Sequence, residues 1–132
     1  MRWISGLFCL LAATACSGKS PAGPSPVARE VVLAPGQMTT IREAAIVVRF
    51  EGVTGDSRCP ADAFCIQGGD ALVQIEVGSA GAARQPYTLH TGDMRPVAHG
   101  DLTIALVQLS PYPFSSRSID PSEYRATLRV TR

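Results

Sequence analysis

From residue 30 onward, hydrophobic and polar residues alternate with a period of two, which is the pattern of β-strands that bury one face. Ile46, Val48 and Phe50, for example, share one face of such a strand, while Arg49 and Glu51 take the other. Gly and Pro residues separate the alternating runs, and no stretch favours a helix. We predict about seven strands, at residues 31–33, 38–41, 45–53, 70–77, 87–90, 102–109 and 124–131.

Strands that are each buried on one face favour two antiparallel sheets packed against each other. We therefore expect an all-β fold, an immunoglobulin-like antiparallel β-sandwich, with a small β-barrel as the alternative. Tyr124 follows a Pro-containing turn, and this arrangement is typical of a tyrosine corner, in which the hydroxyl bonds to nearby backbone. The chain of 132 residues has room for one such domain, expected at 29–132.

Residues 1–15 have the features of a lipoprotein signal peptide. Arg2 supplies a positive charge, a short apolar stretch follows, and small residues precede Cys16. The apolar stretch is too short to cross a bilayer. The A-T-A-C sequence at 13–16 resembles the lipobox of bacterial lipoproteins, in which the cysteine receives diacylglycerol and an acyl chain such as palmitate. Two or three such chains give stable membrane anchoring. An ordinary secretory signal peptide is the alternative.

Residues 16–28 would then comprise the lipidated Cys16 and a tether rich in Pro and Gly, which reaches at most about 40 Å when extended. The protein is thus expected in the cell envelope, anchored by lipid. Ser17, directly after the cysteine, favours the outer membrane, with the domain facing the periplasm, in an organism that has two membranes.

The charge balance narrows the classes of partner. Of the 12 Lys and Arg residues only Arg2 precedes Cys16, so the mature chain would carry as many basic residues as its 11 Asp and Glu. A nucleic-acid-binding protein needs an excess of cations, as does a module held electrostatically on a membrane. We therefore expect no nucleic-acid partner, and attachment to the membrane through lipid.

Two cysteines, Cys59 and Cys65, remain in the domain once the signal peptide is removed and Cys16 is lipidated. Outside the cytoplasm thiols are oxidised, which favours a structural disulfide between the two. A redox pair and a zinc site are the alternatives. Redox catalysis prefers two intervening residues, and zinc needs two further ligands.

The D-S-R-C-P sequence at 56–60, followed by Cys65 and by G-G-D-A at 68–71, resembles an uncharacterised family of small bacterial lipoproteins. Members have one β-domain behind a lipobox, a second cysteine five residues after the first, and a G-[ND]-A entry into the next strand. The resemblance extends to the L-S-P sequence at 109–111 and the last strand. Family members often carry Trp where this chain has Gln67. Because the family has no assigned activity, the resemblance implies fold and location only.

Asp56, Arg58 and Asp70 form a candidate polar site beside the cysteines. The alternative is a structural role, with Asp56 capping the turn and Arg58 paired with a carboxylate. Three glycines would then serve turn conformations: Gly55, Gly68 and Gly69.

Pro111, Tyr112 and Phe114 form a candidate partner loop, because prolines preset the backbone and aromatic rings suit a protein contact. The alternative is that the two rings cover the open end of the sandwich.

A set of possible copper or zinc ligands lies within twelve residues, and it would suit either metal if the strands brought the two histidines together: His90, Asp93, Met94, His99 and Asp101. Residues of these types in a loop are more usually just hydrated. We therefore expect no metal and no cofactor. No nucleophile motif stands out, so no catalytic residue is assigned.

The sequence predicts a non-enzymatic binding domain that contacts an envelope component. A periplasmic copper- or zinc-binding protein and an envelope enzyme without a recognisable motif are the alternatives.

Overall fold

The structure is a computed structural model that describes Gly18 and residues 23–132. The predicted signal peptide, the lipidation site Cys16 and most of the tether lie outside the described residues. In the part of the chain that is described, no helix has the length and apolar character needed to cross a membrane.

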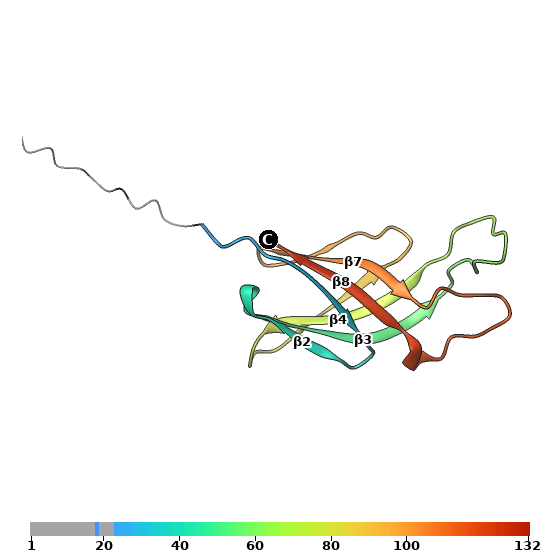
Figure 1. The fold of residues 1–132 in the computed structure, drawn as a ribbon, viewed down its shortest axis with the longest axis horizontal. Helices are drawn as coiled ribbons and strands as arrows, with labels where there is room; N and C mark the ends of the chain where they lie inside the picture. Colours follow the sequence, from blue (N-terminus) through green and yellow to red (C-terminus); the bar gives the residue numbers. More distant parts are fainter. Residues whose placement is uncertain (1–17, 19–22) are drawn as a thin grey trace, which may run out of the picture.

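Eight antiparallel strands form two four-stranded sheets, one above the other in Figure 1. The first sheet has the order β1-β8-β7-β6 and the second the order β2-β3-β4-β5. The strands are β1 (Ala28–Leu33), β2 (Met38–Ile41), β3 (Ile46–Asp56), β4 (Ala71–Ser79), β5 (Gln85–His90), β6 (Val97–His99), β7 (Leu102–Ser110) and β8 (Arg125–Thr131). Two short 3-10 turns occur, η1 (Arg42–Ala44) and η2 (Pro121–Glu123).

The predicted β-sandwich is confirmed, and each predicted strand has a counterpart. The additional strand, β6, has three residues and pairs with β7 in a hairpin, and such a short run carries no visible alternation. Across the described residues β1 does not pair with β2, nor β5 with β6, so the two sheets stay separate and the alternative barrel does not form.

The alternation along each strand produces the core. Val48 and Phe50 of β3 are completely buried, as are Leu128 and Val130 of β8 in the other sheet. Burying side chains of this size contributes about 1.5–3 kcal/mol each. Val27 is also buried, and its carbonyl accepts a hydrogen bond from Arg132 N at 3.0 Å. The folded part therefore begins two residues before the predicted boundary at 29.

The strand pairing places the tether and three loops at opposite ends of the sandwich. Ala28 pairs with Thr131, so the tether enters beside the last residues of the chain. At the other end of β8, Ser110 pairs with Arg125, which places loop 111–124 there (Figure 1). Loops 57–70 and 91–96 lie at that same end, which we call the distal end.

Candidate functional site

A buried arginine holds the two sheets together at the distal end. The Arg58 side chain is 5% exposed and forms an ion pair with Asp56, with Nη2 2.6 Å from Oδ2 and Nε 2.8 Å from Oδ1. The same guanidinium donates to the carbonyl oxygens of Leu109 at 2.9 Å and Pro111 at 3.0 Å. Arg58 also donates its backbone N–H to Asp56 Oδ1 at 3.2 Å. The structural roles considered for this pair, a turn cap and an ion pair, are therefore both present.

Tyr124 completes this network. Its hydroxyl donates to Asp56 Oδ2 at 2.9 Å. The predicted tyrosine corner is therefore wrong, because the acceptor is a carboxylate of β3 in the other sheet and not nearby backbone. Burial and the neighbouring Asp56 carboxylate raise the pKa of Tyr124 to about 12. The hydroxyl thus remains protonated and continues to donate through the neutral range.

The charge of Asp56 should make the fold sensitive to acid. Burial by itself would raise the pKa of Asp56, but the hydrogen bonds from Arg58 and Tyr124 outweigh it and place the pKa below its ordinary value of 3.8. The carboxylate therefore stabilises the fold fully above pH 3.8, and this contribution is lost as the pH falls through the folded-state pKa. We expect urea unfolding to show Asp56→Asn less stable than the natural chain at pH 6, with the difference shrinking at pH 3. A difference that is the same at both pH values would contradict this role.

A disulfide between Cys59 and Cys65 closes the tip of loop 57–70, as predicted, with the two Cα atoms 6.0 Å apart. Since the sulfurs are bonded to each other, neither is free to bind zinc. A disulfide that closes a loop is compatible with the structural role that the sequence predicts for these two cysteines.

We expect the double change Cys59→Ala with Cys65→Ala to lower the free energy of unfolding by about 2 kcal/mol, because the bridge limits the freedom of a short loop in the unfolded chain. The domain should still fold, because its core lies between the sheets. Denaturant unfolding measures the difference. Mass spectrometry of the natural chain after alkylation should find neither cysteine modified, and two alkylated thiols would contradict the pairing.

The loop closed by the disulfide is bound directly to loop 111–124. The Asp62 carboxylate accepts hydrogen bonds from Ser115 N at 2.8 Å and from Ser115 Oγ at 2.6 Å. Ala61 N donates to the Pro113 carbonyl oxygen at 2.9 Å. The cysteine loop and the predicted partner loop, which the sequence presented as separate candidates, therefore form one continuous surface.

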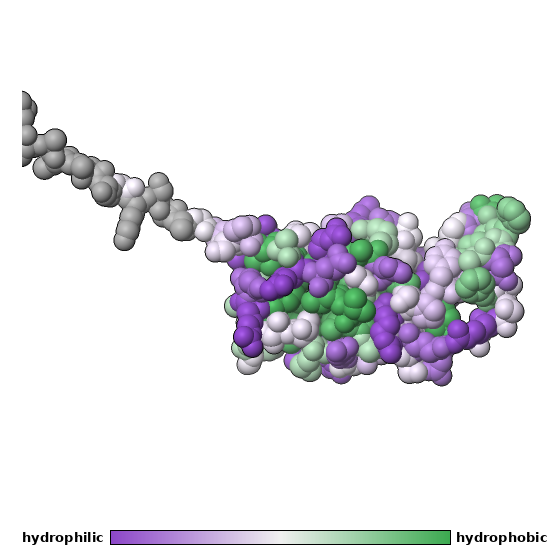
Figure 2. All heavy atoms as spheres, in the orientation of Figure 1, coloured by the Kyte–Doolittle hydropathy of each residue, from purple (hydrophilic) through white to green (hydrophobic). Residues whose placement is uncertain are grey.

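Large apolar side chains are exposed on this surface, and we call the group of Phe64, Ile66, Tyr112 and Phe114 the apolar tip. Phe64 and Ile66 are fully exposed, at 109% and 105%, while Tyr112 and Phe114 are slightly more than half exposed. Figure 2 shows a hydrophobic group of atoms at the end of the protruding loop, which Figure 1 draws in green.

Tyr112 of loop 111–124 combines features of both expectations, while Phe114 is slightly more than half exposed. The centre of the Tyr112 ring lies 5.4 Å from the Arg58 guanidinium carbon, so this ring covers the buried ion pair on one side and faces solvent on the other. Sequence reasoning missed Ile66 and the position of Phe64. The available signal was two bulky apolar residues on either side of Cys65, in a loop whose other residues are mostly small or polar.

The third residue of the predicted polar site has a different role. Asp70 accepts from Gly92 N at 2.9 Å and lies 2.6 Å from His90 Nδ1, and so shapes the turn after β5. The structure thus joins Asp56 to Arg58 but directs the Asp70 side chain to another cluster.

The prediction that Gly55, Gly68 and Gly69 serve turn conformations also needs correction. Gly55 lies within β3, and Gly69 is required for a close backbone contact, not for a turn conformation.

The residues considered for copper or zinc are divided between separate contacts. His90 interacts with Asp70, whereas His99 Nδ1 lies 2.9 Å from the Tyr87 hydroxyl. Within the described ranges, no three His, Cys, Asp or Glu side chains converge in an arrangement that could hold a metal ion.

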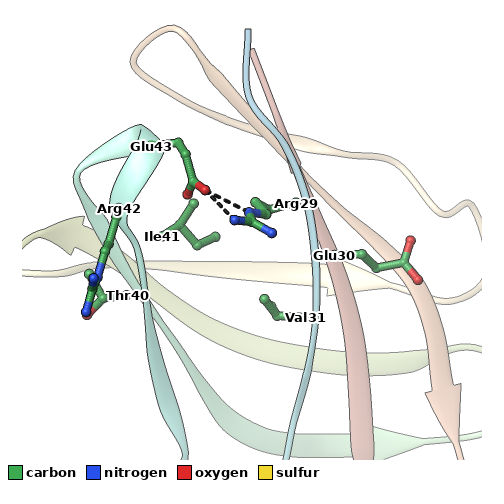
Figure 3. Close-up of a pocket in the computed structure, with 7 residues that line it drawn as sticks. All are labelled: Arg29, Glu30, Val31, Thr40, Ile41, Arg42 and Glu43. Carbon is green, nitrogen blue, oxygen red and sulfur yellow. Dashed lines mark hydrogen bonds and ion pairs between the residues drawn. The ribbon is translucent and has the colours of Figure 1, made fainter. Parts of the chain in front are cut away.

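A hollow lies on the open side of the sandwich, between the edge strands β1 and β2. Figure 3 shows Arg29 and Glu43 pointing toward each other across it, with Arg29 Nε 3.0 Å from Glu43 Oε1. Glu30 and Arg42 add further charges to the same rim. Charged side chains along edge strands oppose the addition of another strand. We therefore take the distal end, and not this side, as the candidate binding surface.

Comparisons of the chain with protein-family models, curated proteins and solved structures found no match. The resemblance to small bacterial lipoproteins accordingly stays a prediction from the sequence.

Proposed function

We propose that this protein is a lipid-anchored lipoprotein of the cell envelope, and that its β-sandwich is a non-enzymatic interaction domain that binds an envelope component through the apolar tip. One observation carries the assignment of the surface: Phe64 and Ile66 are fully exposed on a loop that a disulfide closes. Exposed apolar groups of this size mark interaction sites, because leaving them in water is unfavourable.

The position of the tip supports the same proposal. The tether begins at one end of the sandwich and the apolar tip lies at the other. With lipid on Cys16, the tip would face away from the anchoring membrane and be open to partners. The hydrogen bonds from Ser115 to Asp62 hold the two loops together, which lowers the conformational entropy lost on binding.

The anchor can be tested by metabolic labelling with palmitate. Cys16→Ser removes the thiol that would carry diacylglycerol, and we expect the label to be lost. Cys9→Ser is the matched control, because Cys9 would leave with the signal peptide and its replacement should keep the label. Label that persists after Cys16→Ser, or that is lost only after Cys9→Ser, would refute the anchor.

The tip can be tested in living cells with a photo-crosslinking amino acid at position 64 or 66. We expect adducts of defined mass from both positions. The control position is Gln85, which is exposed at the start of β5, away from the distal end. Equal or absent crosslinking at the three positions would contradict an interaction role for the tip, whatever the outcome of the palmitate experiment.

A further inference from the structure

We propose that the Cys59–Cys65 disulfide is a redox-sensitive clasp, which a dithiol opens by thiol–disulfide exchange while the sandwich stays folded. Opening the bridge would release residues 63–68, and with them Phe64 and Ile66. The reactivity of the bridge goes beyond the proposed function and needs neither the lipid anchor nor a binding partner. Only its consequence for binding, the loss of a fixed apolar tip, rests on the proposed function.

The Cys59 side of the bridge is fixed to the sandwich. Arg58, the residue before it, has a buried side chain that donates hydrogen bonds to backbone carbonyl oxygens at the end of β7 and in loop 111–124. Asp62, on the other side of Cys59, accepts the two hydrogen bonds from Ser115. Because these contacts do not involve a sulfur atom, Cys59 stays in place whether or not it is bonded to Cys65.

The Cys65 side of the bridge has no such support. All residues from 61 to 68 are exposed, and in Figure 1 they lie in the protruding green loop. No hydrogen bond joins residues 63–68 to any described part of the chain outside loop 57–70. Phe64 and Ile66 flank Cys65 and are fully exposed, so neither packs against the sandwich. The bond to Cys59 is therefore what holds these two side chains in a fixed position.

The exposure of Cys65 makes its sulfur the point of attack. Cys65 is exposed, whereas Cys59 is half-buried, and exposed disulfides are the ones that are readily reduced. One thiolate of the dithiol attacks Cys65 Sγ and forms a mixed disulfide with it, and Cys59 leaves as a thiolate that takes up a proton. The second thiol of the dithiol then displaces Cys65. Two electrons and two protons pass from the dithiol to the two cysteines, and the dithiol becomes a disulfide.

Opening the bridge changes the tip and leaves the core intact. The buried side chains lie between the two sheets, and neither cysteine belongs to this core. Residues 63–68, in contrast, gain the freedom of an open chain once the loop is no longer closed. Phe64 and Ile66 would then lose more conformational entropy on binding. The oxidised chain is therefore the form whose apolar tip is prepared for a partner.

The accessibility of the bridge is tested by reducing the purified chain with dithiothreitol, a dithiol, and counting free thiols by alkylation and mass spectrometry. We expect the folded chain to be reduced within about tenfold of the rate of the urea-unfolded chain, because an exposed sulfur can be attacked without unfolding. A larger difference would show that the fold protects the bridge and would overturn the proposal.

The point of attack is tested with reduced glutathione, a monothiol, followed by acid trapping and peptide mapping. We expect the mixed disulfide mainly on Cys65. Glutathione mainly on Cys59 would contradict the fixed position of Cys59 and the exchange step that depends on it.

The release of the segment is tested by chymotrypsin cleavage after Phe64. A protease needs an extended stretch of chain, which the closed loop does not offer, so we expect cleavage to be at least about tenfold faster after reduction. The matched control is the double change Cys59→Ser with Cys65→Ser, which should be cleaved at the faster rate with and without dithiothreitol. Circular dichroism should show the same folded sandwich in both redox states.

Equal cleavage of the oxidised and reduced chains, or unfolding of the whole domain on reduction, would overturn the clasp. These measurements use only the purified chain, so they are independent of the crosslinking experiment in cells. If the bridge opens as expected but positions 64 and 66 do not crosslink in cells, the proposed function fails and the clasp stands. If the tip crosslinks but the bridge resists reduction, the clasp fails and the proposed function stands.

Discussion

Arg58→Ala is expected to lower the free energy of unfolding by about 3–5 kcal/mol, because it removes one partner of a buried ion pair and leaves the other without compensation. The Asp56 side chain is only 12% exposed, so its charge would be poorly solvated. The carbonyl oxygens of Leu109 and Pro111 would lose their donor at the same time. Since a small domain is stable by only about 5–15 kcal/mol in total, this change would remove a large part of its stability.

Urea unfolding followed by circular dichroism measures the effect of Arg58→Ala. Arg129→Ala is the matched control, because Arg129 forms an exposed ion pair with Glu30, at 3.0 Å, and such pairs contribute less than about 1 kcal/mol. Arg58→Lys should also be destabilising, since one ammonium group cannot reach the carboxylate and both carbonyls together. Hydrogen exchange of loop 111–124 should accelerate in both Arg58 variants. Equal stability of the Arg58→Ala and Arg129→Ala variants would contradict the role of Arg58 in joining the sheets.

Gly69→Ala is expected to destabilise the domain by about 3 kcal/mol, because there is no space for a side chain at this position. A Cβ atom on residue 69 would lie 1.4 Å from the carbonyl oxygen of Ser57, which is backbone and cannot move aside alone. Relieving the overlap would separate Ser57 from Asp70, which are joined by a 2.7 Å hydrogen bond from Ser57 N to Asp70 O. The base of the disulfide loop would therefore open.

The neighbouring glycine is a control of the same chemistry. A Cβ atom on Gly68 meets nothing within 4 Å, so Gly68→Ala should change the free energy of unfolding by less than about 0.5 kcal/mol. Thermal and urea unfolding of the two alanine variants will distinguish the destabilisation caused by the close contact at residue 69 from any general effect of replacing a glycine. Similar stabilities for both variants would show that residue 69 does not pack against Ser57 as described.

Several elements of the fold could be predicted because they depend on neighbours in the sequence. The burial of Val48 and Phe50 follows from the period of two in β3. The Cys59–Cys65 disulfide was predicted from two nearby cysteines and from the expectation that the chain is exported to an oxidising compartment. The hairpin strand β6 was missed because three residues are too few to show a period.

The side-chain contacts at the distal end could not be predicted in the same way. Tyr124 has the surroundings of a tyrosine corner in the sequence, but its hydroxyl donates to Asp56, 68 positions earlier. Asp70 stands near Arg58 in the sequence, yet its carboxylate contacts His90. Both expectations assumed that residues close in sequence interact. Instead, Tyr124 reaches Asp56 between the two sheets, and Asp70 meets His90 at the end of the β4–β5 pair.

The sequence alone was enough to predict an all-β domain, with a sandwich favoured over a small barrel, and to favour a disulfide between Cys59 and Cys65. The lipid anchor is likewise a prediction from the sequence. These properties follow from local patterns, namely alternation along a strand, cysteine spacing and the order of residues at the start of the chain. Only the tertiary structure decided that loops 57–70 and 111–124 form one surface at the end opposite the tether. That arrangement depends on the pairing of β1 with β8 and on the contacts of Arg58 with Leu109 and Pro111. The sequence could not reveal it, because contacts between residues far apart in the chain leave no periodic pattern in the sequence.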